Sequence, residues 1–179
     1  LESEVKDAPD AIDMPQVKGE IEFQEASFHY VEGVEVLQDI NIHIQPGENV
    51  ALVGSTGAGK STLVTLIHRF ADVTKGKILI DGHDLKELKR QSLVNQMSMV
   101  LQEPYLFSGT VKENIKYNRE TASDEQMIEA AKAVGAHDFI MQLEEGYDMY
   151  LQERGVNLSV GQRQLLSFAR AIVADPRIL

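Results

Sequence analysis

The residues with the most specific chemistry lie between Asn49 and Thr62, where a short apolar run gives way to glycines and then to a helical pattern. Gly54 to Ser61 follow the spacing G-x-x-x-x-G-K-[ST], typical of a loop whose backbone N–H groups surround phosphate oxygens. Lys60 is expected to lie against the β- and γ-phosphates of a nucleoside triphosphate, and the Ser61 hydroxyl to ligate Mg²⁺. The spacing therefore predicts a phosphate-binding site.

The elements on either side of this loop are expected to position it. Residues 50–53 are an apolar run typical of a buried strand. Apolar residues after the loop recur at the spacing of one helix face: Leu63, Leu66, Ile67 and Phe70. The loop also contains three glycines, which permit positive φ and close approach of the backbone to a ligand: Gly54, Gly57 and Gly59. A glycine-rich turn without a ligand is the alternative, and the order of strand, loop and helix argues against it.

The composition bounds the class of protein. The chain has 179 residues, of which 43% are hydrophobic and 25% charged, enough for one core. No apolar run approaches the roughly 18 residues that a membrane span needs, so any spanning part is expected on another segment or chain. The absence of cysteine excludes disulfides and thiolate ligands. A net charge of −11 argues against a general nucleic-acid surface, which needs clustered Lys and Arg.

The N-terminal half reads as a linker followed by strands. Residues 1–18 are acidic, contain two prolines and show no sustained period, which predicts a linker. A strand pattern starts at residue 19 and shifts phase at Glu25-Ala26, which suggests a bulge. Residues 40–44 alternate cleanly, and residues 77–80 are expected to add another strand. We expect the first two segments to be antiparallel strands that flank the phosphate-loop strand.

The C-terminal half reads as a strand followed by helices. Residues 97–101 are a compact apolar run expected to form a strand that delivers Gln102 to a loop. Ser123 with Gln126, and Ser159 with Gln162, have the spacing of capping boxes that open helices. Another short helix is expected over 136–143, and the last helix is expected to end at Asp175-Pro176, before a strand that begins at Arg177.

Residues 158–164, Leu-Ser-Val-Gly-Gln-Arg-Gln, resemble the ABC-transporter signature L-S-G-G-Q-[RK]-Q, with Val160 in place of the first glycine. Further segments resemble the exporter branch of that family in the same order along the chain: Tyr30 at the adenine-stacking position, Gln102 at the Q-loop, residues 107–110 and 113–115 after it, and Glu153-Arg154-Gly155 before the signature. The resemblance covers residues 19–179.

The resemblance implies an α/β fold with a P-loop NTPase core, an antiparallel β subdomain and a helical subdomain that contains the signature. It implies an acidic linker from a membrane domain at 1–18, a nucleotide-binding domain at 19–179 and a helical subdomain over roughly 103–174. The family's Walker B aspartate, general-base glutamate, D-loop and switch histidine have no counterpart, and all five histidines precede the signature. The core sheet is therefore expected to be incomplete at its C-terminal end.

The resemblance also implies ATP and Mg²⁺ as cofactors, with Lys60 and Gln102 as catalytic residues and Ser61 and Gln102 as metal ligands. It places the nucleotide on Tyr30 and on the loop residues Gly54, Ser55, Thr56, Gly57, Ala58, Gly59, Lys60, Ser61 and Thr62. It adds Ser159, Val160, Gly161 and Gln162 from a second molecule. Each of three positions has another interpretation: Tyr30 as core, Gln102 as a turn residue, and Ser159 as a helix cap bonded to Gln162.

The implied function is ATP binding and hydrolysis in an ABC exporter, at the cytoplasmic face of a membrane. The implied partners are a second nucleotide-binding domain, associated head to tail, and a transmembrane domain fused upstream, with no nucleic acid. Val160 is expected to lower activity without abolishing it, and the 179-residue chain is expected not to hydrolyse ATP at a useful rate. The alternatives are a non-transport ABC ATPase and a module that binds nucleotide without hydrolysis.

Overall fold

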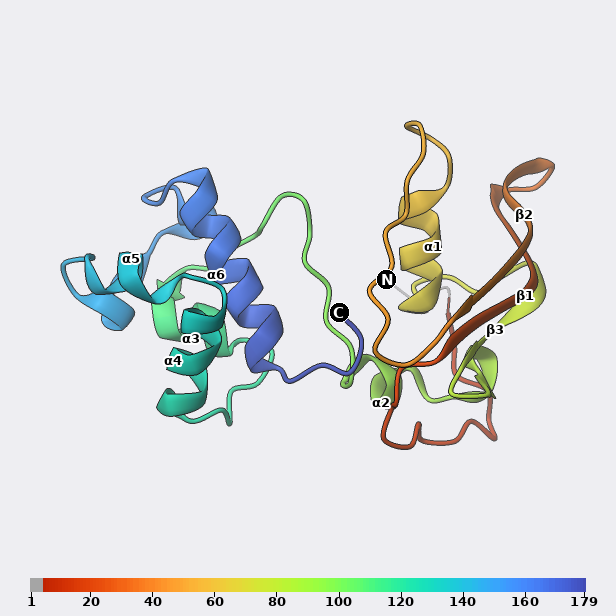
Figure 1. The fold of residues 1–179 in the computed structure, drawn as a ribbon, viewed down its shortest axis with the longest axis horizontal. Coiled ribbons are helices and arrows are strands. Elements are labelled where there is room, and N and C mark those ends of the chain that lie inside the picture. Colours follow the sequence, from red (N-terminus) through yellow and green to blue (C-terminus); the bar gives the residue numbers. More distant parts are fainter. Residues whose placement is uncertain (1–4) are drawn as a thin grey trace. The chain divides into compact units, whose positions relative to one another are not determined.

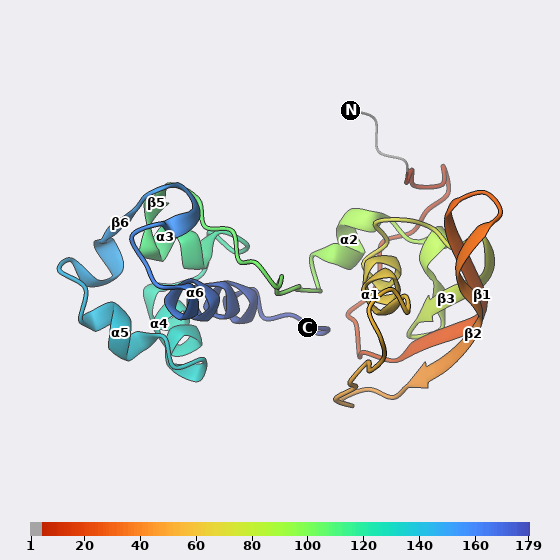
Figure 2. The same ribbon diagram turned by 90° about the horizontal axis from the view of Figure 1, so that it is seen from above.

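The structure, a computed structural model, describes residues 5–179, so residues 1–4 of the expected linker lie outside the described part (Figures 1 and 2). The chain forms two compact units that meet in sequence between Met97 and Ser98. The first unit contains the larger sheet and the helix that follows the phosphate motif. The second is mainly helical, and the stretch expected to be a helical subdomain, roughly 103–174, falls within it.

The sheet of the first unit has the strand order β2-β1-β3-β4. Strand β1 (Ile21–Val31) pairs antiparallel with β2 (Val34–Ile44) and β3 (Lys75–Ile80), and β3 pairs with the short β4 (His83–Asp84). The predicted bulge in β1 is confirmed, because the register shifts between Phe23 and Ala26 and Glu25 has a φ of 48°. Buried apolar residues of β1 and β3 form much of this unit's core: Ile21, Phe23, Ala26, Phe28, Ile78 and Ile80.

The prediction of a strand at residues 50–53 is wrong. Residues 48–55 have no regular secondary structure, and the side chain of Val53 is 90% exposed. A strand is stable when neighbours pair its backbone groups and cover its side chains, and no strand among residues 5–179 pairs with this segment. The expectation that β1 and β2 flank a phosphate-loop strand is also wrong, because residues 50–53 form no strand and β1 pairs directly with β2.

The segment at residues 97–101 likewise does not form the expected strand. Residues 98–101 have no regular secondary structure, and the Ser98 N–H donates a 2.9 Å hydrogen bond to the carbonyl oxygen of Ile178. Ile178 forms only an isolated bridge, so the strand expected to begin at Arg177 is not formed either. The apolar composition of these runs predicts strands. A strand also needs a pairing partner, which the composition of a segment does not supply.

The helix after the phosphate motif is shorter than its apolar pattern predicted. Helix α1 (Lys60–Ile67) buries Leu63 and Leu66 as expected. Arg69 then turns the chain with a φ of 51°, and Phe70 lies outside the helix with 51% of its surface exposed. The expectation that Phe70 continues the buried face is therefore wrong. A 3₁₀ turn (Leu85–Glu87) and helix α2 (Arg90–Val94) complete this unit.

The second unit packs its helices around α6 (Val160–Val173). Helices α3 (Val111–Lys116) and α4 (Asp124–Ala133) both contact α6, and α5 (His137–Met141) follows α4 within the expected range of 136–143 (Figure 1). A two-stranded sheet joins β5 (Gly109–Thr110) to β6 (Tyr150–Leu151). Fully buried side chains from these elements form one core: Leu106, Val111, Ile115, Ile140, Leu151 and Leu166.

The predicted helix boundaries of this unit are confirmed. Ser123 caps α4 in a capping box with Gln126, and Ser159 caps α6 in a capping box with Gln162. Helix α6 ends at Val173, just before Asp175-Pro176. A third capping box, between Thr110 and Glu113, opens α3 and was not recognised in the sequence. Such boundaries are set by side chains three residues apart and therefore need no tertiary context.

The part of the expected linker that the structure describes lies along the first unit. Met14 and Val17 are buried, and their N–H groups donate 2.8 Å hydrogen bonds to Ser92 Oγ and Gln96 Oε1. Within residues 5–179, no helix combines the length and apolar character needed to cross a membrane.

Candidate nucleotide-binding site

The phosphate motif forms a loop over residues 54–59 that leads into the N-terminus of α1. Gly57 and Gly59 have φ values of 84° and 85°, a region that L side chains rarely adopt. A Cβ atom on Gly59 would also lie 2.6 Å from Leu37 Cδ2 and 3.3 Å from the Val36 carbonyl oxygen. Glycine is therefore required at 59 both by the backbone and by the closeness of β2, whereas a Cβ on Gly57 would meet open space.

The Lys60 side chain folds back over this loop. Its ammonium donates to the carbonyl oxygens of Gly54 at 2.8 Å and Ser55 at 2.7 Å. An ammonium has three donors, so two carbonyls leave one donor for an anion at the loop. The Lys60 ammonium thus lies beside the loop backbone, which the motif predicts to surround phosphate.

The residues around Lys60 offer the remaining groups that a nucleotide needs. The loop from Gly54 to Ala58 is exposed, and so is Ser61 in the first turn of α1. Serine oxygen is the hard ligand type that Mg²⁺ accepts, and Mg²⁺ is commonly held by few protein ligands together with substrate phosphates. Among residues 5–179, no group of three or more His, Asp or Glu side chains could hold a metal alone. The residues present therefore fit Mg²⁺ that arrives with a phosphate ligand.

Tyr30 lies next to the phosphate loop and is not a core residue. The residue is 62% exposed, and its ring meets the buried Phe28 ring edge-on, with centroids 4.7 Å apart. Its hydroxyl lies 3.3 Å from the Thr62 hydroxyl, which is itself buried in α1. The interpretation of Tyr30 as core is therefore excluded, and its ring is available for stacking beside residues 54–62.

Ser159 opens helix α6 in the second unit. The Gln162 N–H donates to Ser159 Oγ at 3.2 Å, and the Ser159 N–H donates to Gln162 Oε1 at 2.9 Å. Val160 is 66% exposed, and a Cβ on Gly161 would meet no atom within 4 Å. The N-terminus of this 14-residue helix thus presents partial positive charge at an open surface.

The turn before Ser159 is held in place by contacts of Arg154, Gly155 and Arg163, which lie in the segments that resemble the ABC family. Arg163 Nη1 donates to the carbonyl oxygens of Leu158 at 2.6 Å and Gly155 at 3.3 Å. Gly155 has a φ of 60°, and a Cβ there would lie 2.8 Å from Leu106 Cδ1. The Arg154 N–H donates to the Leu106 carbonyl oxygen at 2.9 Å. These contacts fix the start of α6 on the core of its unit.

The predicted site residues are divided between the two units. The first unit brings Tyr30 together with Thr62, in the first turn of α1 after the phosphate loop. The second assembles residues 159–162 into a helix start and also contains Gln102, which is exposed in a bend.

Sequence reasoning missed a pocket of about 230 Å³ in the second unit, lined by Tyr105, Phe107, Tyr117 and Arg170 among others. Arg170 donates to the carbonyl oxygens of Asn114 and Tyr105 at 2.8 Å each, and its guanidinium lies 5.5 Å from the Phe107 ring centroid. Partial burial lowers the pKa of Arg170. Tyr105 and Phe107 come from one loop and Tyr117 from the C-terminal cap of α3, without a shared period, so no sequence pattern signalled the pocket.

Comparison with known proteins decides the family. The model of the ABC transporter family matches residues 37–179. The chain belongs to the ABC transporter family. A Bacillus subtilis protein named as a multidrug export ATP-binding/permease protein, YgaD, is 50% identical over 174 residues, which is 97% of this chain and 30% of that protein. A Staphylococcus aureus relative with the same kind of name is 53% identical over 163 residues, 90% of this chain and 28% of that protein.

The fold comparison agrees. The structure of a bacterial Atm1-family ABC exporter with ATP bound superposes with a TM-score of 0.92 at 38% identity, over 97% of this chain and 30% of that one. The expected ABC ATPase fold is thus confirmed, and so is the resemblance to exporters. The chain spans about 30% of the length of the proteins it matches.

Proposed function

We propose that this chain is the ATP-binding part of an ABC exporter and takes Mg²⁺-ATP at residues 54–62, the phosphate loop and the first turn of α1. The observation that carries the proposal is the Lys60 ammonium, held at the loop carbonyls at the N-terminus of α1. Lys60 would move one or more of its hydrogen bonds to the β- and γ-phosphates, while N–H groups from Gly54 to Thr62 and the helix dipole stabilise the triphosphate. Ser61 would ligate Mg²⁺, and Tyr30 would stack on adenine.

Gln102 is proposed as a second metal ligand and a sensor of the γ-phosphate. An uncharged amide can accept a hydrogen bond from a metal-bound water and donate one to phosphate. Its exposure in a bend leaves both groups available. Phosphoryl transfer needs positioning and charge neutralisation more than covalent work from the protein, which suits the roles assigned to Lys60 and Gln102.

The second half of the site is proposed to come from another ABC nucleotide-binding domain, arranged head to tail. Ser159, Val160, Gly161 and Gln162 would meet the γ-phosphate of the partner's nucleotide. The exposed, serine-capped start of α6 supports this, because the cap uses Ser159 Oγ as an acceptor and leaves its O–H proton as a donor. The Val160 side chain projects where the signature has glycine, so we propose that it slows closure without preventing it.

The remaining parts of the proposal concern the polypeptide that contains this chain. We propose a nucleotide-binding domain over 19–179 with a helical subdomain over roughly 103–174, joined through residues 1–18 to a transmembrane domain at the cytoplasmic face of a membrane. The relatives named as ATP-binding/permease proteins support a fused arrangement. No nucleic acid is proposed as a partner, given the net charge of −11.

We also propose that the 179-residue chain alone hydrolyses ATP slowly, because the family's general-base glutamate and switch histidine have no counterpart among its residues. Phosphate release should stay below about one turnover per second, low in the usual enzyme range. The Lys60→Ala variant serves as the negative control for phosphate release. Turnover near that rate would contradict this part of the proposal and leave ATP binding untouched.

Titration calorimetry with Mg²⁺-ATP tests the binding step. The unaltered chain should bind saturably, and Tyr30→Ala should weaken binding about fivefold or more, since base stacking on an aromatic ring contributes about 1–3 kcal/mol. Tyr150→Ala is the matched control, because Tyr150 is 60% exposed, similar to Tyr30, and lies in the other unit's small sheet. Absence of saturable binding would reject the proposed function, and equal effects of the two variants would reject the role of Tyr30.

A further inference from the structure

Residues 6–20, which we call the N-terminal strap, are hydrogen-bonded along the first unit. Strap residue Ile12 donates from its N–H to the Glu87 carbonyl oxygen at 3.0 Å and accepts from the Lys89 N–H at 2.8 Å. Farther along, three successive N–H groups reach one carboxylate: Lys18 and Glu20 donate to Asp81 at 2.6 and 2.9 Å, and Gly19 at 3.2 Å. These hydrogen bonds attach the strap to the segment of residues 81–96.

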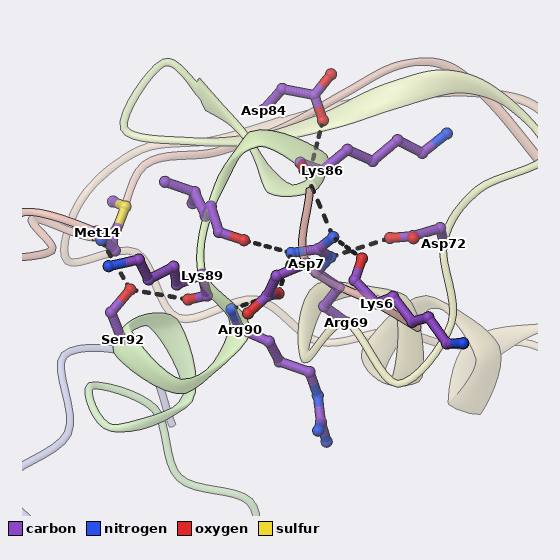
Figure 3. Close-up of polar contacts among 11 residues, drawn as sticks. Lys6, Asp7, Met14, Arg69, Asp72, Asp84, Lys86, Lys89, Arg90 and Ser92 are labelled. Carbon is purple, nitrogen blue, oxygen red and sulfur yellow. Dashed lines mark hydrogen bonds and ion pairs between the residues drawn. The ribbon is translucent and has the colours of Figure 1, made fainter. Parts of the chain in front are cut away.

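The first residues of the strap meet Arg69, whose side chain is only 2% exposed (Figure 3). A buried guanidinium is costly unless its donors are satisfied, and here they face two carboxylates and several backbone carbonyls. The distances are 3.1 Å to Asp72, 3.3 Å to Asp7, and 3.5 Å to the carbonyl oxygens of both Lys6 and Lys86, with a further short bond to the carbonyl of Leu88.

Asp7 is the carboxylate that the strap contributes. Its Oδ1 accepts from Arg69 Nη1 and also from the backbone N–H of Arg90, the latter at 3.0 Å. Asp7 is 62 residues from Arg69 in sequence, so this contact closes a long loop of chain. Asp72, by contrast, is a near neighbour of Arg69 at i+3. Among these carboxylates, Asp7 alone ties the strap to Arg69.

Arg69 also lies directly after the end of the phosphate-loop helix. Its N–H donates to the Leu66 carbonyl oxygen at 2.9 Å, and Leu66 is fully buried in α1. Helix α1 has eight residues and is about 12 Å long at 1.5 Å per residue. Lys60 lies in its first turn and Arg69 just beyond its last. One short rigid element therefore joins the phosphate loop to the buried guanidinium that holds the strap.

We propose that the strap is mechanically coupled to the phosphate loop, with Arg69 as the link, so that nucleotide binding at the loop tightens the strap. This rests on the proposed function, because it takes ATP as the ligand of the loop. Phosphate competes with the carbonyls of Gly54 and Ser55 for the Lys60 ammonium, so the start of α1 is where binding changes local contacts. By linkage, release of the strap lowers ATP affinity by the same factor by which ATP favours the bound strap.

Hydrogen–deuterium exchange of the full 179-residue chain, with and without Mg²⁺-ATP, tests the coupling. In the unaltered protein, Mg²⁺-ATP should slow exchange in peptides covering residues 12–20 by on the order of fivefold, the lower end of typical coupling. Asp7→Asn should reduce that slowing to below about twofold, while protection of the loop peptides over 54–62 persists. A merely structural role for Asp7 would lower protection equally with and without nucleotide.

Asp13→Asn is the matched control. Asp13 also lies in the strap and forms an exposed ion pair with Lys89 at 2.9 Å, but that pair does not involve Arg69, so the nucleotide effect should persist. Asp7→Glu keeps the carboxylate and should retain the coupling in full or in part. Loop protection without any strap response, or an unchanged response in Asp7→Asn, would overturn the inference alone. Absence of loop protection would reject the proposed function and the inference with it.

Discussion

The Lys60 ammonium donates a hydrogen bond of 2.8 Å to the carbonyl oxygen of Gly54, across the loop that it is expected to share with phosphate. A second bond, to Ser55 at 2.7 Å, holds the cation in the same place. The side chain is thus preorganised at the loop, and a bound phosphate exchanges one charge-assisted partner for another instead of ordering a mobile lysine.

Replacement of Lys60 by methionine should weaken Mg²⁺-ATP binding by at least about tenfold, since a charge-assisted bond is worth roughly 1.5–3 kcal/mol. The free energy of unfolding should change by less than about 1 kcal/mol, because Lys60 is not fully buried. Calorimetric titration and urea unfolding measure the two quantities. Lys132→Met, which removes an exposed lysine bonded to Glu129, should leave ATP affinity unchanged. Similar affinities for the two variants would contradict the prediction.

Alanine at Gly59 should destabilise the protein more than alanine at Gly57. Both residues have nearly the same positive φ, so the backbone cost of about 1 kcal/mol or more is shared. At Gly59 the new Cβ would lie 2.6 Å from Leu37 Cδ2, which adds an overpacking cost of roughly 1–3 kcal/mol. Urea unfolding of the two variants measures the difference. Equal losses of stability would show that β2 moves aside freely. Leu37 is itself buried, so the clash is measured by a double-mutant cycle, in which Gly59→Ala should cost less in a Leu37→Ala background than in the unaltered chain.

The two serine capping boxes allow stability to be separated from function. Ser123→Ala and Ser159→Ala each remove a cap with the same geometry, so each should cost about 1 kcal/mol of folding free energy. Under the proposed function, only Ser159→Ala should also weaken Mg²⁺-ATP-dependent association of two domains. Sedimentation velocity of the polypeptide that contains this chain, at several concentrations, gives the dimer constant. If both variants dimerise alike, Ser159 acts only as a cap.

His43 should titrate at a higher pH than an ordinary histidine. Its Nε2 lies 2.7 Å from Glu20 Oε1, and this hydrogen bond, more than the nearby acidic charges, raises the pKa of His43. Because the folded pKa is raised, the contribution to stability is complete below an unfolded pKa of about 6.5 and is lost as the pH rises through the higher folded value. NMR titration of the ring gives the pKa. Glu20→Gln should lower it markedly and Glu22→Gln only slightly; the reverse order would contradict this assignment.

Local signals in the sequence were sufficient for several features. The phosphate motif located the loop and the start of α1, because its glycines and lysine act through backbone within a few residues. The pairs Ser123 with Gln126 and Ser159 with Gln162 located two helix starts, because a capping box is complete within four residues. The phase shift at Glu25 located the bulge in β1.

Other features were decided by tertiary structure alone. The apolar runs at 50–53 and 97–101 predicted strands, yet a strand exists only where another strand pairs with it, and the sequence of a segment does not contain its partner. The exposure of Tyr30 beside Thr62, and the burial of Arg69 with Asp7 from 62 residues away, follow from how distant segments pack. The sequence by itself therefore located the phosphate motif and the helix starts, whereas the contacts between distant segments required the folded chain. Packing and strand pairing depend on residues that no local pattern specifies.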